Sequence, residues 1–160
     1  GYSSAASDVY KRQLLRLMHI AGQRPRYDTE VCFTVHEEVG HGGATLPQVD
    51  ELLAVDMGCV GLDLTCTEEQ VSICAKDSAG PYDYDMVSRL VALAKEGGVD
   101  YAVDVYPHYS SDVAVAWKAG SDAKAALIGP GVQASHGMER THFHGMRETI
   151  KLIALYLECA

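Results

Sequence analysis

Short apolar runs, separated by polar and glycine-rich stretches, predict an alternation of strands and helices along this chain. Runs that are rich in β-branched and aromatic residues, or that alternate apolar with polar positions, are typical of strands. The first run follows this rule most closely, because five of the six residues from Val31 to His36 are apolar or β-branched, and it is predicted to be a buried strand. The predicted strands are residues 30–35 (EVCFTV), 51–56 (ELLAVD), 70–77 (QVSICAKD), 100–106 (DYAVDVY) and 123–129 (AKAALIG).

Helical spacing of apolar residues is clearest over residues 85–98 (DMVSRLVALAKEGG). This segment has an acidic residue at its start, an apolar stripe and a Gly-Gly stop, which together predict a helix. Further helices are predicted over residues 14–23, 110–120 and 145–160, and a single helical turn is expected over residues 46–50 (LPQVD). Strands that alternate with helices predict an α/β domain of three layers, with a mostly parallel sheet and helices on both faces.

The net charge limits the expected partners, and the cysteine content limits the expected kinds of metal site. A formal net charge of −9 disfavours nucleic acid and anionic membranes as partners, because both require clustered Lys and Arg. The five cysteines are scattered and contain no C-x-x-C pair, which favours free thiols in a reducing cytoplasm over a thiolate metal site.

The first thirteen residues have a different character from the rest of the chain. Residues 8–13 (DVYKRQ) back-translate to a string that resembles the end of a transposon used to prepare sequencing libraries. We therefore expect residues 1–13 to be non-native or disordered, and residues 14–160 to carry the folded domain.

Candidate chemistry is concentrated where predicted strands end. Glu37 and Glu38 follow the first strand, Asp56 the second, Asp112 the fourth and His136 the fifth. In α/β sheets, ligands gather beyond the carboxyl ends of the strands. Carboxylates and imidazole are ligands for zinc, cobalt or manganese, and such an ion lowers the pKa of a bound water. A neighbouring carboxylate that is not a ligand can remove the water's proton, which would explain the glutamate doublet.

Five segments of the chain resemble, in the same order, motifs of the co-catalytic metallo-aminopeptidases of metallopeptidase family forty-two. This group includes glutamyl and tetrahedral aminopeptidases and has also been labelled cellulase or endoglucanase. The segments are FTVHEEVGHGGA, LLAVDMG, KDSAGPYDYDMVSRL, YSSDVAVAWKAG and ASHGMERTH. The resemblance covers residues 14–160, which resemble the carboxyl-terminal half of a truncated zinc-exopeptidase-like catalytic domain. It implies a hydrolase that removes amino-terminal residues from peptides with two divalent metal ions, and a homo-oligomeric full-length parent.

The resemblance also implies roles for individual residues. Glu37 matches the general base of the family, Glu38 and His136 match ligands of one metal, and Asp56 matches a ligand of the other. Asp112 matches a recurrent acid near the site, although it is equally suited to cap its own helix. Glu139 and His142 are expected to stabilise the loop that carries His136 without binding the metal themselves. His108 and His144 are interpreted as structural.

Two departures from the family pattern bear on activity. A histidine ligand in a G-H-x-D segment and a bridging aspartate in an L-D-x-R segment precede the doublet in family members, and neither segment occurs here. The 160 residues are therefore expected to be inactive alone. Two alternatives stay open: a glycoside hydrolase with two carboxyls flanking the scissile bond, and a non-catalytic binding module.

Overall fold

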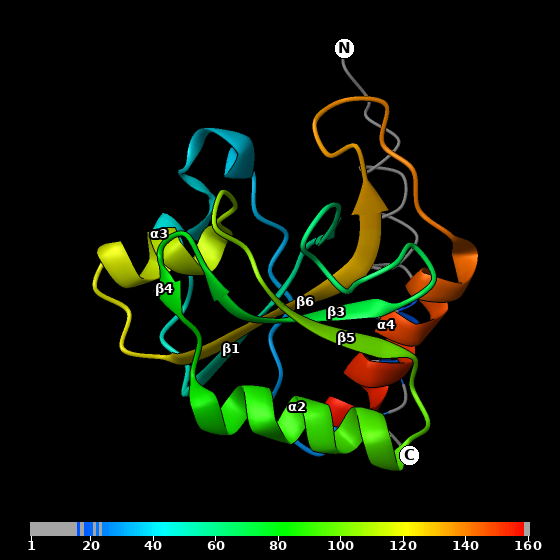
Figure 1. The fold of residues 1–160 in the computed structure, drawn as a ribbon. Helices are drawn as coiled ribbons and strands as arrows, with labels where there is room; N and C mark the ends of the chain where they lie inside the picture. The colour runs from blue at the N-terminus through cyan, green and yellow to red at the C-terminus, as the bar shows by residue number, and fades with distance from the viewer. Residues whose placement is uncertain (1–15, 17, 21, 23, 159–160) are drawn as a thin grey trace.

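A mixed sheet of six strands forms the centre of the molecule (Figure 1). The computed structural model describes residues 16, 18–20, 22 and 24–158. The strands are β1 (Glu51–Val55), β2 (Gly58–Val60), β3 (Val71–Asp77), β4 (Gly80–Pro81), β5 (Tyr101–Val105) and β6 (Lys124–Gln133).

The sheet combines parallel and antiparallel pairs. Strand β6 pairs in parallel with β1 and then with β2, and β3 pairs in parallel with β5. The central β3–β6 pair and the short β3–β4 pair are antiparallel. The α/β prediction is therefore confirmed, and parallel pairs outnumber antiparallel ones. However, β5 runs opposite to β1 and β6, so the carboxyl ends of the predicted strands do not all meet at one edge.

Helices cover both faces of the sheet, as the sequence predicts. Helices α2 (Tyr84–Glu96) and α4 (Phe143–Tyr156) pack on one face, and α3 (Asp112–Lys118) packs on the other (Figure 1). The first face buries Ile73, Leu90, Ile128 and Leu152 in one core cluster, and the second buries Tyr106, Val113 and Leu127. Fully burying each of these large side chains contributes about 1.5–3 kcal/mol, so the two clusters stabilise the three layers.

The helix ends show why these segments are helical. The side chain of Asp83 accepts a hydrogen bond from the backbone N–H of Met86 at the start of α2, and Gly97 follows the helix. At α3, the Ser111 side chain accepts from the N–H of Val113, so Ser111 is the cap. Each such cap contributes about 1 kcal/mol. The predicted helices over 85–98, 110–120 and 145–160 are thus confirmed, with ends shifted by a few residues.

The prediction of a buried strand over residues 30–35 is wrong. This segment forms no strand, and its apolar side chains are exposed, to 55% for Phe33 and 73% for Val35. A strand needs a neighbour to accept and donate its backbone hydrogen bonds. The nearest strand, β1, pairs with β6 on one side and is separated from residues 27–34 by a cleft on the other. Composition indicates strand propensity but not the presence of a neighbour.

Two other local predictions also differ from the structure. Residues 46–50 do not form a helical turn, and short 3₁₀ helices occur instead at η1 (Glu37–Val39) and η2 (Gly42–Thr45). Of the helix predicted over residues 14–23, residues 16 and 18–20 are helical. The expectation for residues 1–13 lies outside the described residues. Within the described part of the chain, no helix has the length and apolar character needed to cross a membrane.

Candidate metal and catalytic site

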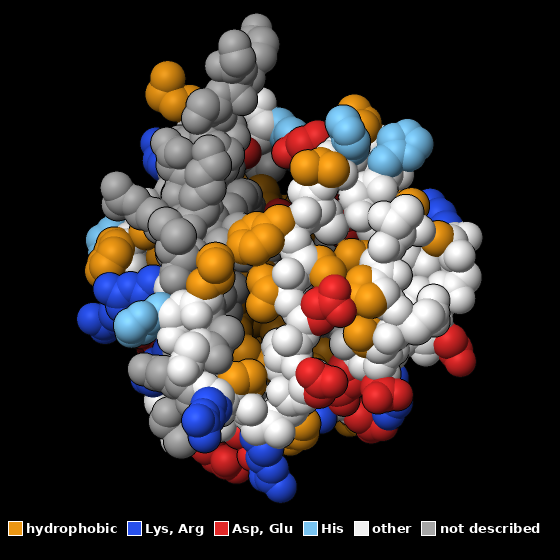
Figure 2. Space-filling model, turned by 180° about the vertical axis from the view of Figure 1, so that it is seen from behind, with side chains coloured by type: hydrophobic (Ala, Val, Ile, Leu, Met, Phe, Trp, Pro, Cys, Tyr) orange, Lys and Arg blue, Asp and Glu red, His pale blue; other side chains and the backbone are white. Residues whose placement is uncertain are grey.

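The candidate site lies in a cleft of about 1140 Å³ between the open side of β1 and residues 27–34. Hydrophobic side chains line a hollow on the face shown in Figure 2. The residues that line this cleft include Glu37, Glu38, Asp56, Asp112, His136 and Glu139. The structure therefore brings together six of the seven residues that the sequence singled out.

The glutamate doublet lies on the short helix η1, in a turn that begins with a left-handed residue. His36 has φ 64° and ψ 28°, a conformation that is uncommon for a residue with a side chain. The backbone N–H groups of Val39 and His41 both donate to the carbonyl of His36, which closes the turn. Neighbouring residues of a 3₁₀ helix point in directions about 120° apart. This turn, and not the end of a strand, lets Glu37 and Glu38 contact different parts of the site.

Glu38 and His136 meet across 98 residues of sequence. The His136 Nε2 and the Glu38 Oε2 are 2.9 Å apart, and the Ser135 hydroxyl lies 2.9 Å from the other ring nitrogen. The hydrogen bond that His136 makes to the Glu38 carboxylate raises the pKa of His136, and the nearby charges of Glu38, Glu139 and Glu37 act in the same direction. Both side chains are exposed to solvent. The pair offers one carboxylate and one imidazole to an incoming cation.

The loop that carries His136 follows β6 and is held in an uncommon conformation. Both Ala134 and His136 have positive φ angles, of 57° and 62°. The backbone N–H of His136 donates to Glu139 Oε1 at 2.9 Å, and this hydrogen bond holds the loop in its conformation. The other Glu139 oxygen is buried and has no hydrogen-bond partner within the part of the chain that the structure describes. Left-handed non-glycine residues cost about 1 kcal/mol or more and gather at functional sites.

Glu37 is half-buried among other acids. Burial, together with the nearby charges of Asp56, Glu38 and Asp112, raises the pKa of Glu37 to about 7, and His136 acts in the opposite direction. A carboxyl group that titrates near neutral pH can accept and release a proton at that pH. The role of Glu37 as the base stays a prediction, and this environment is compatible with it.

Asp56 follows β1 directly and is fixed by β6. Its backbone N–H donates to the carbonyl of Ile128 at 2.9 Å, and its Oδ1 accepts from the backbone N–H of Met57 at 2.7 Å. Because β1 and β6 are parallel, Asp56 and the His136 loop leave the sheet at the same edge. This placement agrees with the expected gathering of ligands at strand ends.

Asp112 approaches the site by a different route and does not cap its helix. Strand β5 points away from this edge, and the chain returns before α3 begins. Ser111 caps α3, while the Oδ1 atom of Asp112 is buried and forms no hydrogen bond with any described residue. The carboxylate packs against Gly42, where a Cβ would lie 2.4 Å from Oδ1. The glycines of the HGGA segment thus allow α3 to approach the loop that carries the doublet.

His142 is placed differently from Glu139. Its Nδ1 accepts a hydrogen bond from the backbone N–H of His144 at the start of α4, and the same atom lies 4.0 Å from Glu69. These contacts support helix α4. A role for His142 in stabilising the loop that carries His136 stays a prediction.

The donor set at this edge fits divalent metal ions in its chemistry. It offers several carboxylates and an imidazole, and it includes buried oxygens of Asp112 and Glu139 that lack a donor. A cation here would also reduce the mutual repulsion that raises the pKa of Glu37. Within the described residues, however, the group with three ligand atoms inside 4.8 Å is Asp100, His144 and Glu148, and not the predicted set.

The raised pKa of Glu37 predicts how the stability of the metal-free chain depends on pH. The folded chain takes up a proton near pH 7, whereas the unfolded chain takes it up near the ordinary pKa of 4.5. The free energy of unfolding in a chelator is therefore expected to rise as the pH falls from about 8 to about 6. The raised pKa of His136 acts with the same sign.

Urea unfolding at several pH values measures this dependence in the unmodified chain and in Glu37→Gln. On folding in this pH range, Glu37→Gln should bind fewer protons than the unmodified chain, by at most about one, while the contribution of His136 remains. Equal slopes in the two proteins would show that Glu37 does not titrate near neutral pH.

The chain shares its fold with solved aminopeptidase structures. The structure superimposes on the dodecameric PhTET1-12s with a TM-score of 0.73 at 18% identity, covering 89% of this chain and 46% of that one. It also matches the TET1 peptidase of Pyrococcus horikoshii, which can assemble into a tetrahedron or a large octahedral shell. That match has a TM-score of 0.67 at 20% identity and covers 78% and 39% of the two chains.

The chain belongs to the M42 glutamyl aminopeptidase family, whose sequence profile matches residues 12–152. It is also 44% identical over 153 residues to "Putative aminopeptidase YhfE" of Bacillus subtilis (strain 168). That match covers 91% of this chain and 43% of YhfE, so the chain spans less than half the length of this relative. Enzymes of this family hydrolyse peptides and depend in general on metal ions.

Proposed function

We propose that this chain is part of a metal-dependent aminopeptidase that hydrolyses the amino-terminal peptide bond of its substrates. The observation that carries the proposal is the contact between Glu38 and His136, at 2.9 Å, beside the half-buried Glu37. Two residues far apart in the sequence offer ligands there, and a third acid that is not needed as a ligand has a pKa near 7. Membership of the M42 family supports the same assignment.

The residues present would hold two divalent ions, of zinc, cobalt or manganese. Glu38 and His136 would bind one ion, and Asp56 would bind the other. The ions would supply Lewis acidity at the scissile carbonyl and acidify the attacking water. Glu139 would hold His136 in place through the backbone N–H.

The proton transfers are assigned to Glu37. It would remove a proton from the attacking water and later deliver it to the leaving amine, as a general base and then a general acid. The cleft beside β1 would receive the peptide substrate. The Asp112 carboxylate, whose Oδ1 atom is buried, would supply negative charge near the positively charged amino end of the peptide.

Three further statements belong to the proposal. The 160 residues alone would be inactive, because the G-H-x-D and L-D-x-R segments of the family do not occur among them. The whole protein would form homo-oligomers, as the TET peptidases do. A cytoplasmic location is consistent with the free thiols of Cys32, Cys59, Cys66 and Cys74.

Chelation of the whole protein tests the proposal. Hydrolysis of aminoacyl anilides is expected to fall below detection after treatment with EDTA and dialysis, and to return when zinc, cobalt or manganese is added. The 160-residue chain serves as the control and should show no hydrolysis under any of these conditions.

The same assay separates the proposal from the glycosidase alternative. A glycoside hydrolase with two flanking carboxyls does not need a metal ion. Cleavage of β-glucan that persists in EDTA, without hydrolysis of anilides, would contradict the peptidase assignment.

A further inference from the structure

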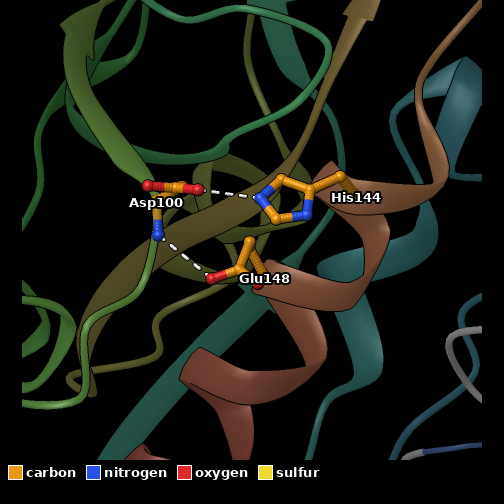
Figure 3. A group of neighbouring side chains, drawn as sticks. All are labelled: Asp100, His144 and Glu148. Carbon is orange, nitrogen blue, oxygen red and sulfur yellow. Dashed lines mark hydrogen bonds and ion pairs between the residues drawn. The ribbon is translucent and has the colours of Figure 1, made fainter.

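A second cluster of metal-ligating side chains lies away from the cleft, where helix α4 meets the start of β5. Figure 3 shows Asp100, which precedes β5, facing His144 and Glu148 of α4. One ligand atom from each residue lies within 4.8 Å of the other two. None of the three residues lines the cleft that contains Glu38 and His136.

The backbone fixes two of the ligands before any ion binds. His144 and Glu148 are four residues apart on α4, so their side chains emerge from the same face of the helix. The backbone N–H of Asp100 donates to Glu148 Oε2 at 3.0 Å, and the carbonyl of Asp100 accepts from the N–H of Val71 at 3.0 Å. The side chain of Glu148 is only 4% exposed. Its carboxylate is therefore held inside the fold, where charge is costly unless it is compensated.

The distances suit a small ion after a modest adjustment. His144 Nε2 lies 2.7 Å from Asp100 Oδ2, which is a hydrogen-bond distance. Zinc binds nitrogen and oxygen at about 2.0–2.2 Å in a tetrahedron, which places two ligand atoms about 3.4 Å apart. An ion would thus replace this hydrogen bond after Asp100 and His144 separate by less than about 1 Å, with the Glu148 oxygen, which lies within 4.8 Å of both ligand atoms, as the third donor. Asp100 is exposed and free to make that movement.

We propose that Asp100, His144 and Glu148 form a site for a divalent transition-metal ion, which ties helix α4 to the start of β5. One imidazole and two carboxylates suit zinc, cobalt and nickel, and leave a coordination position for water. The ion would link parts of the chain that are 44 and 48 residues apart. Binding to the folded chain alone would stabilise it.

Two neighbouring cations set the affinity of this site. Arg147 Nε lies 3.7 Å from Glu148 Oε1, and Lys151 Nζ lies 3.9 Å from Glu148 Oε2. An Arg147 nitrogen also lies 3.4 Å from His144 Nδ1. When Nε2 binds a metal, Nδ1 carries the proton and must donate, so the Arg147 group has to leave. Both cations are exposed and can turn into solvent. Replacing Arg147 is therefore expected to tighten metal binding.

Titration calorimetry with zinc tests the site in the 160-residue chain. The background variant Glu38→Gln/His136→Gln removes the donors of the candidate catalytic site, and one bound zinc is expected to remain. Added His144→Ala or Glu148→Gln should weaken that binding by about tenfold or more, and Arg147→Gln should strengthen it. Glu96→Gln, at an exposed glutamate near the end of α2, is the matched control and should leave it unchanged.

NMR spectroscopy of the background variant, in which Asp100, His144 and Glu148 are intact, locates the ion. This measurement remains informative even if His144→Ala or Glu148→Gln impairs folding. Cobalt is paramagnetic and accepts the same donors. Its addition should broaden the backbone NMR signals of residues 99–101 and 143–149 first. Absence of zinc binding in the background variant, unchanged affinity in His144→Ala, or broadening centred elsewhere would each overturn the proposal.

Discussion

Replacing Glu37 with Gln in the whole protein is expected to lower kcat for aminoacyl anilides by about 10²- to 10⁴-fold. Glutamine has nearly the same shape but cannot take a proton from water. The substitution also removes one negative charge from the group formed with Asp56, Glu38 and Asp112. Metal binding should nevertheless be retained, because the predicted ligands Glu38, Asp56 and His136 are unchanged.

Two measurements together separate loss of the base from loss of the metal. The metal content of the purified variant should equal that of the unmodified protein, while its turnover is lost. Glu96→Gln again provides a matched control and should keep full activity. If Glu37→Gln retained turnover, Glu37 would not be the base. If the variant lost its metal, Glu37 would be a ligand.

The sequence predicted well those elements whose pattern reflects local preference and a single buried face. Residues 85–98 have a cap, an apolar stripe and a glycine stop, and the helix α2 follows them. Strand β6 is longer than predicted because its buried pattern continues through Gly129, Pro130 and Gly131. Glycine and proline usually end a strand. Here the partners β1, β2 and β3 on both sides keep the strand extended.

The sequence failed where structure depends on distant neighbours. Residues 30–35 have the composition of a strand, but they pair with no strand among the described residues. Strands β2 and β4 were not predicted, because they are short and depend on their pairing with β6 and β3. Strand propensity is a matter of context, and a single sequence does not reveal which strands meet.

The candidate site was predicted by chemistry more than by geometry. Glu37, Glu38, Asp56 and His136 were selected as acids and a histidine after strands, and they line one cleft. The predicted reason for their proximity, a position after a strand at one edge of the sheet, holds for Asp56 and His136. It does not hold for the doublet, which lies on η1, or for Asp112, which follows a strand of opposite direction. His144 and Glu148 were missed as a pair, because the predicted helix began at residue 145 and left His144 just outside it, whereas α4 begins at Phe143.

The close contact between β6 and the chain after β1 links the fold to the candidate site. Gly129 of β6 is buried directly beneath Asp56. A Cβ at this position would lie 1.6 Å from the carbonyl oxygen of Asp56 and 3.0 Å from the Cα of Met57. No side-chain rotation relieves such a clash, because both groups belong to the backbone. The strand and the residue that would bind metal therefore have to move together.

Gly129→Ala is accordingly expected to lower the free energy of unfolding by about 3 kcal/mol, the upper part of the usual range for overpacking. Urea unfolding measures this loss. The matched control is Gly61→Ala, at an exposed position where a Cβ meets no atom within 4 Å, and its effect should stay within about 0.5 kcal/mol. Similar stabilities for the two variants would show that β6 and Asp56 do not approach so closely. Because the clash displaces Asp56, the same substitution in the whole protein should also weaken metal binding, whereas Gly61→Ala should not.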